Sequence, residues 1–87
     1  MAEIIKVDGT RQELKDTSLK SLQKAVGGYI QIITLHTKPA QLMVMDEEGK
    51  LKDKPLNKEA TRIARPYLFS GDYIAGDAVL AAENEIQ

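Results

Sequence analysis

Val26-Gly27-Gly28-Tyr29-Ile30 marks the point in the chain where a helical pattern of apolar residues gives way to a strand pattern. Before it, leucine and valine recur at helical spacing over residues 19–26. After it, residues 29–35 are rich in β-branched side chains, which favour strands. The two adjacent glycines permit left-handed backbone angles, as a tight turn from helix to strand requires. This junction indicates a domain that mixes helices and strands.

On the N-terminal side, Thr17 and Ser18 are candidate N-caps of this helix, because their hydroxyls can accept a bond from a free amide of the first turn. A β-hairpin is predicted before them. Its strands cover residues 4–7 and 11–15, and Asp8-Gly9, a strong hairpin-turn signal, joins them.

On the C-terminal side, residues 41–45 predict a second strong strand, after a loop over residues 36–40. The segment Asp46-Glu47-Glu48-Gly49 has the pattern of a type I turn with glycine in the left-handed position. We expect residues 50–52 to continue as a short pairing strand.

A second helix is predicted from Asn57, a candidate N-cap, to Pro66, which ends it because the residue before a proline is disfavoured in the helical region. A turn follows, and residues 73–81 then predict the last strand, with a bend or bulge at Gly76. Residues 82–87 are expected to form a loose tail.

The expected fold class is therefore α+β: a small, mostly antiparallel sheet in the order ββαββαβ, with one or two short helices packed on one side. With 87 residues the chain forms one domain, residues 1–87, near the lower end of what buries an independent core. Association of copies is a common remedy for a small core, so a homo-oligomer is expected.

Composition excludes several classes of protein. The chain has no cysteine, which rules out a disulfide framework and a thiolate metal site. Twelve basic and thirteen acidic residues give a net charge of -1, unlike a dedicated nucleic-acid binder. No run approaches the roughly 18 apolar residues of a membrane span, and the N-terminus lacks a signal-peptide pattern. We expect a cytoplasmic protein that binds neither membranes nor nucleic acid.

Taken together, residues 3–81 resemble a family of small proteins, each a domain of unknown function, that are common in phages, plasmids and other bacterial mobile elements. The resemblance rests on two paired signatures, Gly-Gly-Tyr-Ile at residues 27–30 and Gly-Asp-Tyr-Ile-Ala-Gly at residues 71–76. The acidic turn over residues 46–51 and the Pro55-Leu56-Asn57 segment agree with it.

The resemblance implies a bacterial host cytoplasm and an accessory role such as host takeover or counter-defence. It transfers no catalytic or binding residue, because the family has none established. By analogy, small phage proteins without catalytic groups can sequester nucleotide signals of bacterial immunity.

Residues with catalytic or metal-binding chemistry are few. His36 is the only histidine, and a metal site needs several ligands, so an exposed loop histidine is the simpler interpretation. The acidic turn lacks the spaced oxygen ligands of a calcium loop, and a solvated turn is expected there. Neither a nucleophile elbow nor a phosphate-binding glycine loop occurs. We therefore expect no enzyme activity, no metal and no cofactor.

The strongest candidate site is a basic stripe of Lys58, Arg62 and Arg65. On a helix their spacing of i, i+4 and i+7 places all three on one side, and the helix start adds amides that favour anions. Arginine can bind a phosphate with two bonds, and Tyr29, Tyr73 or Tyr67 can stack on a base. The alternative is an ordinary solvated helix face.

Two functions from different classes remain. The first is a non-enzymatic module that binds and sequesters a small anionic ligand, such as a nucleotide signal. The second is a protein-interaction module that inhibits a host protein through an exposed sheet edge or a tyrosine surface, a mode that leaves little trace in sequence.

Overall fold

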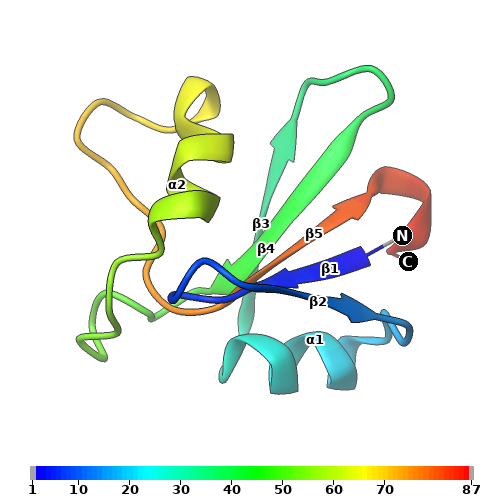
Figure 1. Cartoon of the computed structure of the whole chain (residues 1–87), viewed down its shortest axis with the longest axis horizontal. Coiled ribbons are helices and arrows are strands. Elements are labelled where there is room, and N and C mark those ends of the chain that lie inside the picture. The colour runs from blue at the N-terminus through cyan, green and yellow to red at the C-terminus, as the bar shows by residue number, and fades with distance from the viewer. Residues whose placement is uncertain (1, 87) are drawn as a thin grey trace.

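A five-stranded antiparallel sheet in the order β2-β1-β5-β4-β3 forms the centre of the computed structural model, which describes residues 2–86 (Figure 1). The α+β class and the ββαββαβ order predicted from sequence are confirmed. The strands are β1 (Ala2–Ile5), β2 (Arg11–Leu14), β3 (Ile30–Leu35), β4 (Gln41–Asp46) and β5 (Ala78–Ala82). The helices are α1 (Leu19–Val26) and α2 (Lys58–Ala64), with the 3-10 turns η1 (Arg65–Tyr67) and η2 (Glu83–Glu85).

The two helices cover opposite faces of the sheet, not one side as expected (Figure 1). Met43 and Leu80 pack towards α2, whereas their neighbours Val44 and Val79 pack towards α1. The physical reason is that successive strand residues point to opposite faces, and the central strands β4 and β5 are apolar on both. A sheet that is apolar on both faces needs a cover on each.

Both ends of α1 are capped as the sequence predicts. The Ser18 hydroxyl accepts a hydrogen bond from the Ser21 amide at 3.3 Å and caps the helix start. At the other end Gly27 takes a left-handed conformation, with φ of 81°. The amides of Gly27 and Gly28 both donate to the carbonyl of Gln23, at 2.8 and 3.1 Å, which ends the helix.

The first strand lies earlier than predicted. It covers Ala2–Ile5 because Lys6 already belongs to the turn, where its carbonyl accepts a bond from the Gly9 amide at 2.9 Å. Gly9 has φ of 90°, as the predicted turn requires.

The acidic turn differs from the prediction in two ways. Gly49 is not in the left-handed region. The residue of this turn that takes a left-handed conformation is Asp53, with φ of 55°. Gly49 is needed for space instead, because a Cβ atom at this position would lie 2.7 Å from the carbonyl oxygen of Ala75. Residues 50–52 form no strand, since short-range bonds such as Lys52 N to Glu48 O (3.0 Å) continue the turn.

The last strand is shorter than residues 73–81 because Gly76, with φ of 85°, bends the chain before β5 begins. Ala75 makes only an isolated bridge to Leu56. Within the segment predicted as a loose tail, Ala82 belongs to β5 and the Glu85 carbonyl accepts a hydrogen bond from the Thr17 hydroxyl, so these two residues are held in place. Gln87 lies outside the described residues.

Candidate functional site

The basic stripe lies on the outer side of α2. Asn57 caps this helix through Oδ1, which accepts a bond from the Ala60 amide at 3.0 Å. Ala60 and Ala64 are fully buried against the sheet, so the helix turns its other side to solvent. α2 has only seven residues and its cap already occupies the Ala60 amide, so the helix start adds no separate anion site.

The structure brings the three predicted cations together around one hollow. Its volume is about 320 Å³, and none of the five residues that line it is acidic. The lining residues are Leu56, Lys58, Thr61, Arg62 and Arg65. We refer to it below as the basic hollow.

Arg62 is held in place by Glu59. Its Nε and Nη2 atoms lie 2.7 and 2.9 Å from the two carboxylate oxygens, a bidentate pair. Arg11 of β2 reaches the same carboxylate, with Nη2 at 2.8 Å from Oε2. Hydrogen bonds from Arg62 and then Arg11 lower the pKa of Glu59 to about 2, so it is ionised at neutral pH. One carboxylate therefore orients two guanidinium groups.

The other two cations keep their charge available. Arg65 donates from Nη1 to the Asp72 carbonyl at 3.0 Å, a neutral partner, and the nearby Asp72 carboxylate, which its charge also helps to stabilise, forms its ion pair with Lys50. Lys58 has no ion pair or hydrogen bond from its side chain within residues 2–86. The hollow therefore carries net positive charge even after Glu59 is counted.

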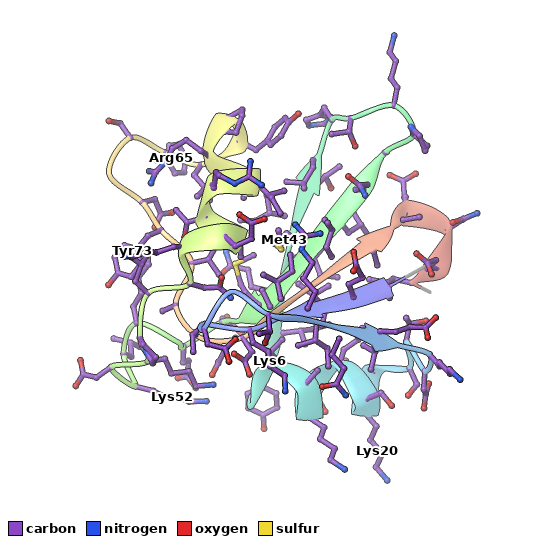
Figure 2. The ribbon with its side chains drawn as sticks, viewed as in Figure 1. Lys6, Lys20, Met43, Lys52, Arg65 and Tyr73 are labelled. Atoms are coloured by element: carbon purple, nitrogen blue, oxygen red, sulfur yellow. The ribbon has the colours of Figure 1, made fainter. Side chains whose placement is uncertain are left out.

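Tyr73 and Tyr29 are not part of the basic hollow. Tyr73 lines a second hollow of about 310 Å³, where the Lys50 ammonium lies 4.7 Å from its ring centroid. Lys50 also pairs with the Asp72 carboxylate, and this hydrogen bond lowers the pKa of Asp72. Tyr29 is 70% exposed and lines neither hollow. Figure 2 shows Arg65 and Tyr73 on the same side of the molecule, and Arg65 of the basic hollow bonds the carbonyl of Asp72, which lines the second hollow.

Asp46 departs most from its sequence interpretation as part of a solvated turn. Its side chain is fully buried and lies 2.6 Å from Lys54 Nζ and 2.9 Å from Lys52 Nζ. Lys54 also donates to the Val26 carbonyl at 2.7 Å, at the end of α1. Burial alone would raise the pKa of Asp46, but bonds from Lys54, the Glu48 amide and Lys52 outweigh it and lower the pKa to about 2. This cluster joins α1 to the turn after β4.

The sequence predicts the basic stripe but not the long-range contacts that hold the surrounding residues in place. The stripe is a local pattern of helix spacing, whereas Arg11 meets Glu59 across 48 residues and Lys54 meets Val26 across 28. The only sequence signal for the Asp46 cluster is the pair of glycines, because a Cβ atom at Gly28 would lie 2.5 Å from Lys52 Nζ and 2.7 Å from Asp46 Oδ1.

Among residues 2–86, no group of three or more His, Asp or Glu side chains is arranged to hold a metal ion. His36 is exposed and its ring centroid lies 5.9 Å from that of Tyr67. In the same range, no helix has the length and apolar character needed to cross a membrane.

Comparison with known proteins gives one match. The model of the family described as Domain of unknown function (DUF3846) matches residues 1–86, nearly the whole chain. No curated protein and no solved structure matches it.

Proposed function

The chain belongs to the DUF3846 family of domains of unknown function, and we propose that it is a non-enzymatic module that binds a small anionic ligand in the basic hollow. One observation carries this proposal. Three cations and no acid line a hollow of about 320 Å³, a size within the range of small-molecule sites. The ligand class that fits best is a phosphate-bearing metabolite, with a nucleotide as the leading example.

Each lining residue has a distinct part in this proposal. Arg65 and Arg62 offer planar guanidinium groups to phosphate oxygens, and Glu59 pre-orients that of Arg62. Lys58 supplies a mobile ammonium. Leu56, which is 45% exposed, gives an apolar surface against which a sugar or base can pack.

A nucleobase in this proposal packs either on Leu56 or on the Tyr73 side of the hollow. The Asp72 carbonyl that Arg65 holds is adjacent in sequence to Tyr73, so a ligand longer than a phosphate group extends from Arg65 towards that ring. Tyr29 has no part in the proposed site, since it lines neither hollow.

The biological role that we propose is sequestration of a nucleotide signal in a bacterial cytoplasm, as an accessory protein of a phage or another mobile element. Sequestration requires affinity and no bond breaking, which agrees with a site built of cations and an apolar wall. The resemblance to proteins of mobile elements supports the same role.

Calorimetry and thermal shift test the binding proposal directly. The probes are inorganic phosphate, pyrophosphate, and linear and cyclic nucleotides. A ligand at a hundred times its Kd is expected to stabilise the fold by about 2.7 kcal/mol. The double variant Lys58→Ala/Arg65→Ala is expected to lose this effect, and Arg65→Lys to retain part of it, because the charge stays but the planar fork is lost.

A matched control removes the same charge elsewhere. Lys20→Ala/Lys24→Ala changes two exposed lysines of α1, and Figure 2 shows Lys20 on the opposite side of the molecule from Arg65. Affinity is expected to survive this change at moderate salt. The binding proposal fails if no probe raises the melting temperature, or if the control lowers affinity as much as the site variant does.

A second candidate function is inhibition of a host protein, and the second hollow favours it. Leu51 and Tyr73 line this hollow and remain 82% and 40% exposed, so two large side chains with apolar surface are open to a partner at one site. Capture of one stoichiometric protein from host lysate, lost in Leu51→Ser and kept in Lys58→Ala/Arg65→Ala, supports this candidate over ligand binding.

A further inference from the structure

One edge of the sheet is open and has regular backbone groups. β3 is the last strand of the order and pairs only with β4 (Figure 1). The Tyr29 carbonyl accepts a bond from Glu47 at 2.9 Å, so Tyr29 turns its backbone groups towards β4. Because these groups alternate in direction along an antiparallel strand, the N–H and C=O groups of Ile30, Ile32 and Thr34 point outward.

This edge lacks the devices that usually protect a strand from pairing. Residues 29–35 contain no charged side chain and no proline, and each of residues 30–35 opposes one residue of β4, so there is no bulge. Ile32 is 43% exposed. At the other edge β2 has only four residues and carries Arg11 and Glu13.

We propose that β3 pairs with β3 of a second copy of this chain, antiparallel, around a two-fold axis at Ile32. A two-fold axis perpendicular to the sheet keeps both faces aligned, so residues of like face must oppose each other. In one register, centred on Ile32, each of the three outward residues lies opposite an outward residue of the second copy. Ile32 exchanges bonds with its own copy, and Ile30 exchanges bonds with Thr34 of the second copy.

The side chains suit the same register. The exposed Ile32 packs against Ile32 of the second copy on the α1 face, as Ile30 already packs towards that face. On the other face Tyr29 lies opposite Leu35, and Gln31 lies opposite Ile33. No charge meets a like charge at any position, since residues 29–35 are all uncharged. The occupant is a second copy because the same strand supplies, on both sides of the axis, the outward backbone groups, the exposed Ile32 and an uncharged edge.

The inference does not depend on the proposed ligand. No residue of β3 lines the basic hollow, so a dimer forms or fails to form whatever the hollow binds. Failure of the dimer and failure of ligand binding are separate results.

Light scattering of the purified chain tests the pairing. The wild type is expected at twice the chain mass of 9.6 kDa, falling to one chain on dilution. Ile32→Lys and Ile32→Glu each place like charges opposite each other and are expected at 9.6 kDa. An equimolar mixture of the two variants is expected to regain twice that mass, because opposite charges then face each other across the axis.

The control is Gln12→Lys on the exposed β2 edge, which is expected to remain dimeric. Hydrogen exchange of the wild type adds a measurement that needs no variant. The amides of Ile30, Ile32 and Thr34 are expected to be protected at high concentration and to exchange rapidly after dilution. A wild type that is monomeric at high micromolar concentration, dimers that persist in Ile32→Lys, variants that fail to pair with each other, or loss of the dimer in Gln12→Lys would each overturn the proposal.

Discussion

At the scale of single residues, two glycines of this chain serve different purposes. Gly49 has an ordinary φ, but a Cβ atom there would lie 2.7 Å from the Ala75 carbonyl oxygen. Gly71 has φ of 82° and open space around it. We expect Gly49→Ala to cost about 2 kcal/mol through a clash and Gly71→Ala about 1 kcal/mol through left-handed strain.

Asparagine separates the two causes, because it tolerates left-handed angles but is larger than alanine. Gly71→Asn is expected to recover most of the lost stability, whereas Gly49→Asn is expected to be worse than Gly49→Ala. Urea denaturation of the four variants measures this. Recovery in Gly49→Asn would show that the turn needs a conformation at Gly49 and not space.

Asp46 predicts a loss of stability in acid. Its pKa is about 2 in the folded chain, against an ordinary value of 3.8, so the folded state favours the ionised form. The stabilisation is therefore complete above the unfolded pKa and is lost as the pH falls from about 4 through about 2. We expect this loss to amount to about 2 kcal/mol.

The variant Asp46→Asn is expected to be less stable at pH 7 and to show a flatter decline in acid, because it has no carboxylate to protonate. Asp53→Asn is the matched control in the same turn, since asparagine suits its φ of 55°. Urea denaturation from pH 7 to pH 2.5 compares the three proteins. If the free energy of unfolding falls equally with pH in the wild type and in Asp46→Asn, the loss of stability in acid does not come from Asp46.

At the scale of secondary-structure elements, the caps of the two helices differ in depth. Asn57 is fully buried, caps α2, and donates from Nδ2 to the carbonyls of Ile5 and Gly76, at 2.8 and 2.9 Å. Ser18 caps α1 at the surface. We expect Asn57→Asp to cost about 3 kcal/mol, because it retains the cap but leaves two buried carbonyls facing a carboxylate. Ser18→Ala is expected to cost about 1 kcal/mol.

Thermal unfolding measures both caps, and the decisive comparison is Asn57→Asp with Asn57→Ser. Serine also retains a capping oxygen but carries no negative charge, so it is expected to cost less than aspartate. If aspartate is tolerated as well as serine, the two carbonyls do not repel a carboxylate at this position and the cause given for the cost of Asn57→Asp is wrong.

These elements also show which predictions were possible from sequence. Strands β3 and β4 and the end of α1 follow from local features: β-branched runs and a glycine pair. The predicted start of β5 is wrong, because Gly76 turns the chain before the strand begins and the hydrogen bond from Asn57 to the Gly76 carbonyl holds this turn in place. That bond joins residues 19 apart in the sequence, which no local pattern reports. The basic stripe could be predicted because it follows from the spacing of residues along one helix. The separation of Tyr73 from it could not, because it depends on how distant segments fold together.

At the scale of the whole molecule, one sheet supports two cores that face opposite ways. Met43 belongs to the core under α2 and Val44 to the core over α1, although they are neighbours in β4. Because β1, β3, β4 and β5 each contribute residues to both cores, loss of either core removes the partner surface of the other. We therefore expect the domain to unfold as one cooperative unit.

Met43→Ala and Val44→Ala test this, in the Ile32→Lys background so that association does not enter. We expect costs of about 3 and about 2 kcal/mol, and a fall in Tm of roughly 4–8 °C for each kcal/mol. Hydrogen exchange is expected to accelerate equally in α1 and α2 for both variants, since either loss lowers the stability of a single unit. If Val44→Ala releases α1 while α2 keeps its protection, each face is a separate folding unit and the shared sheet does not couple them.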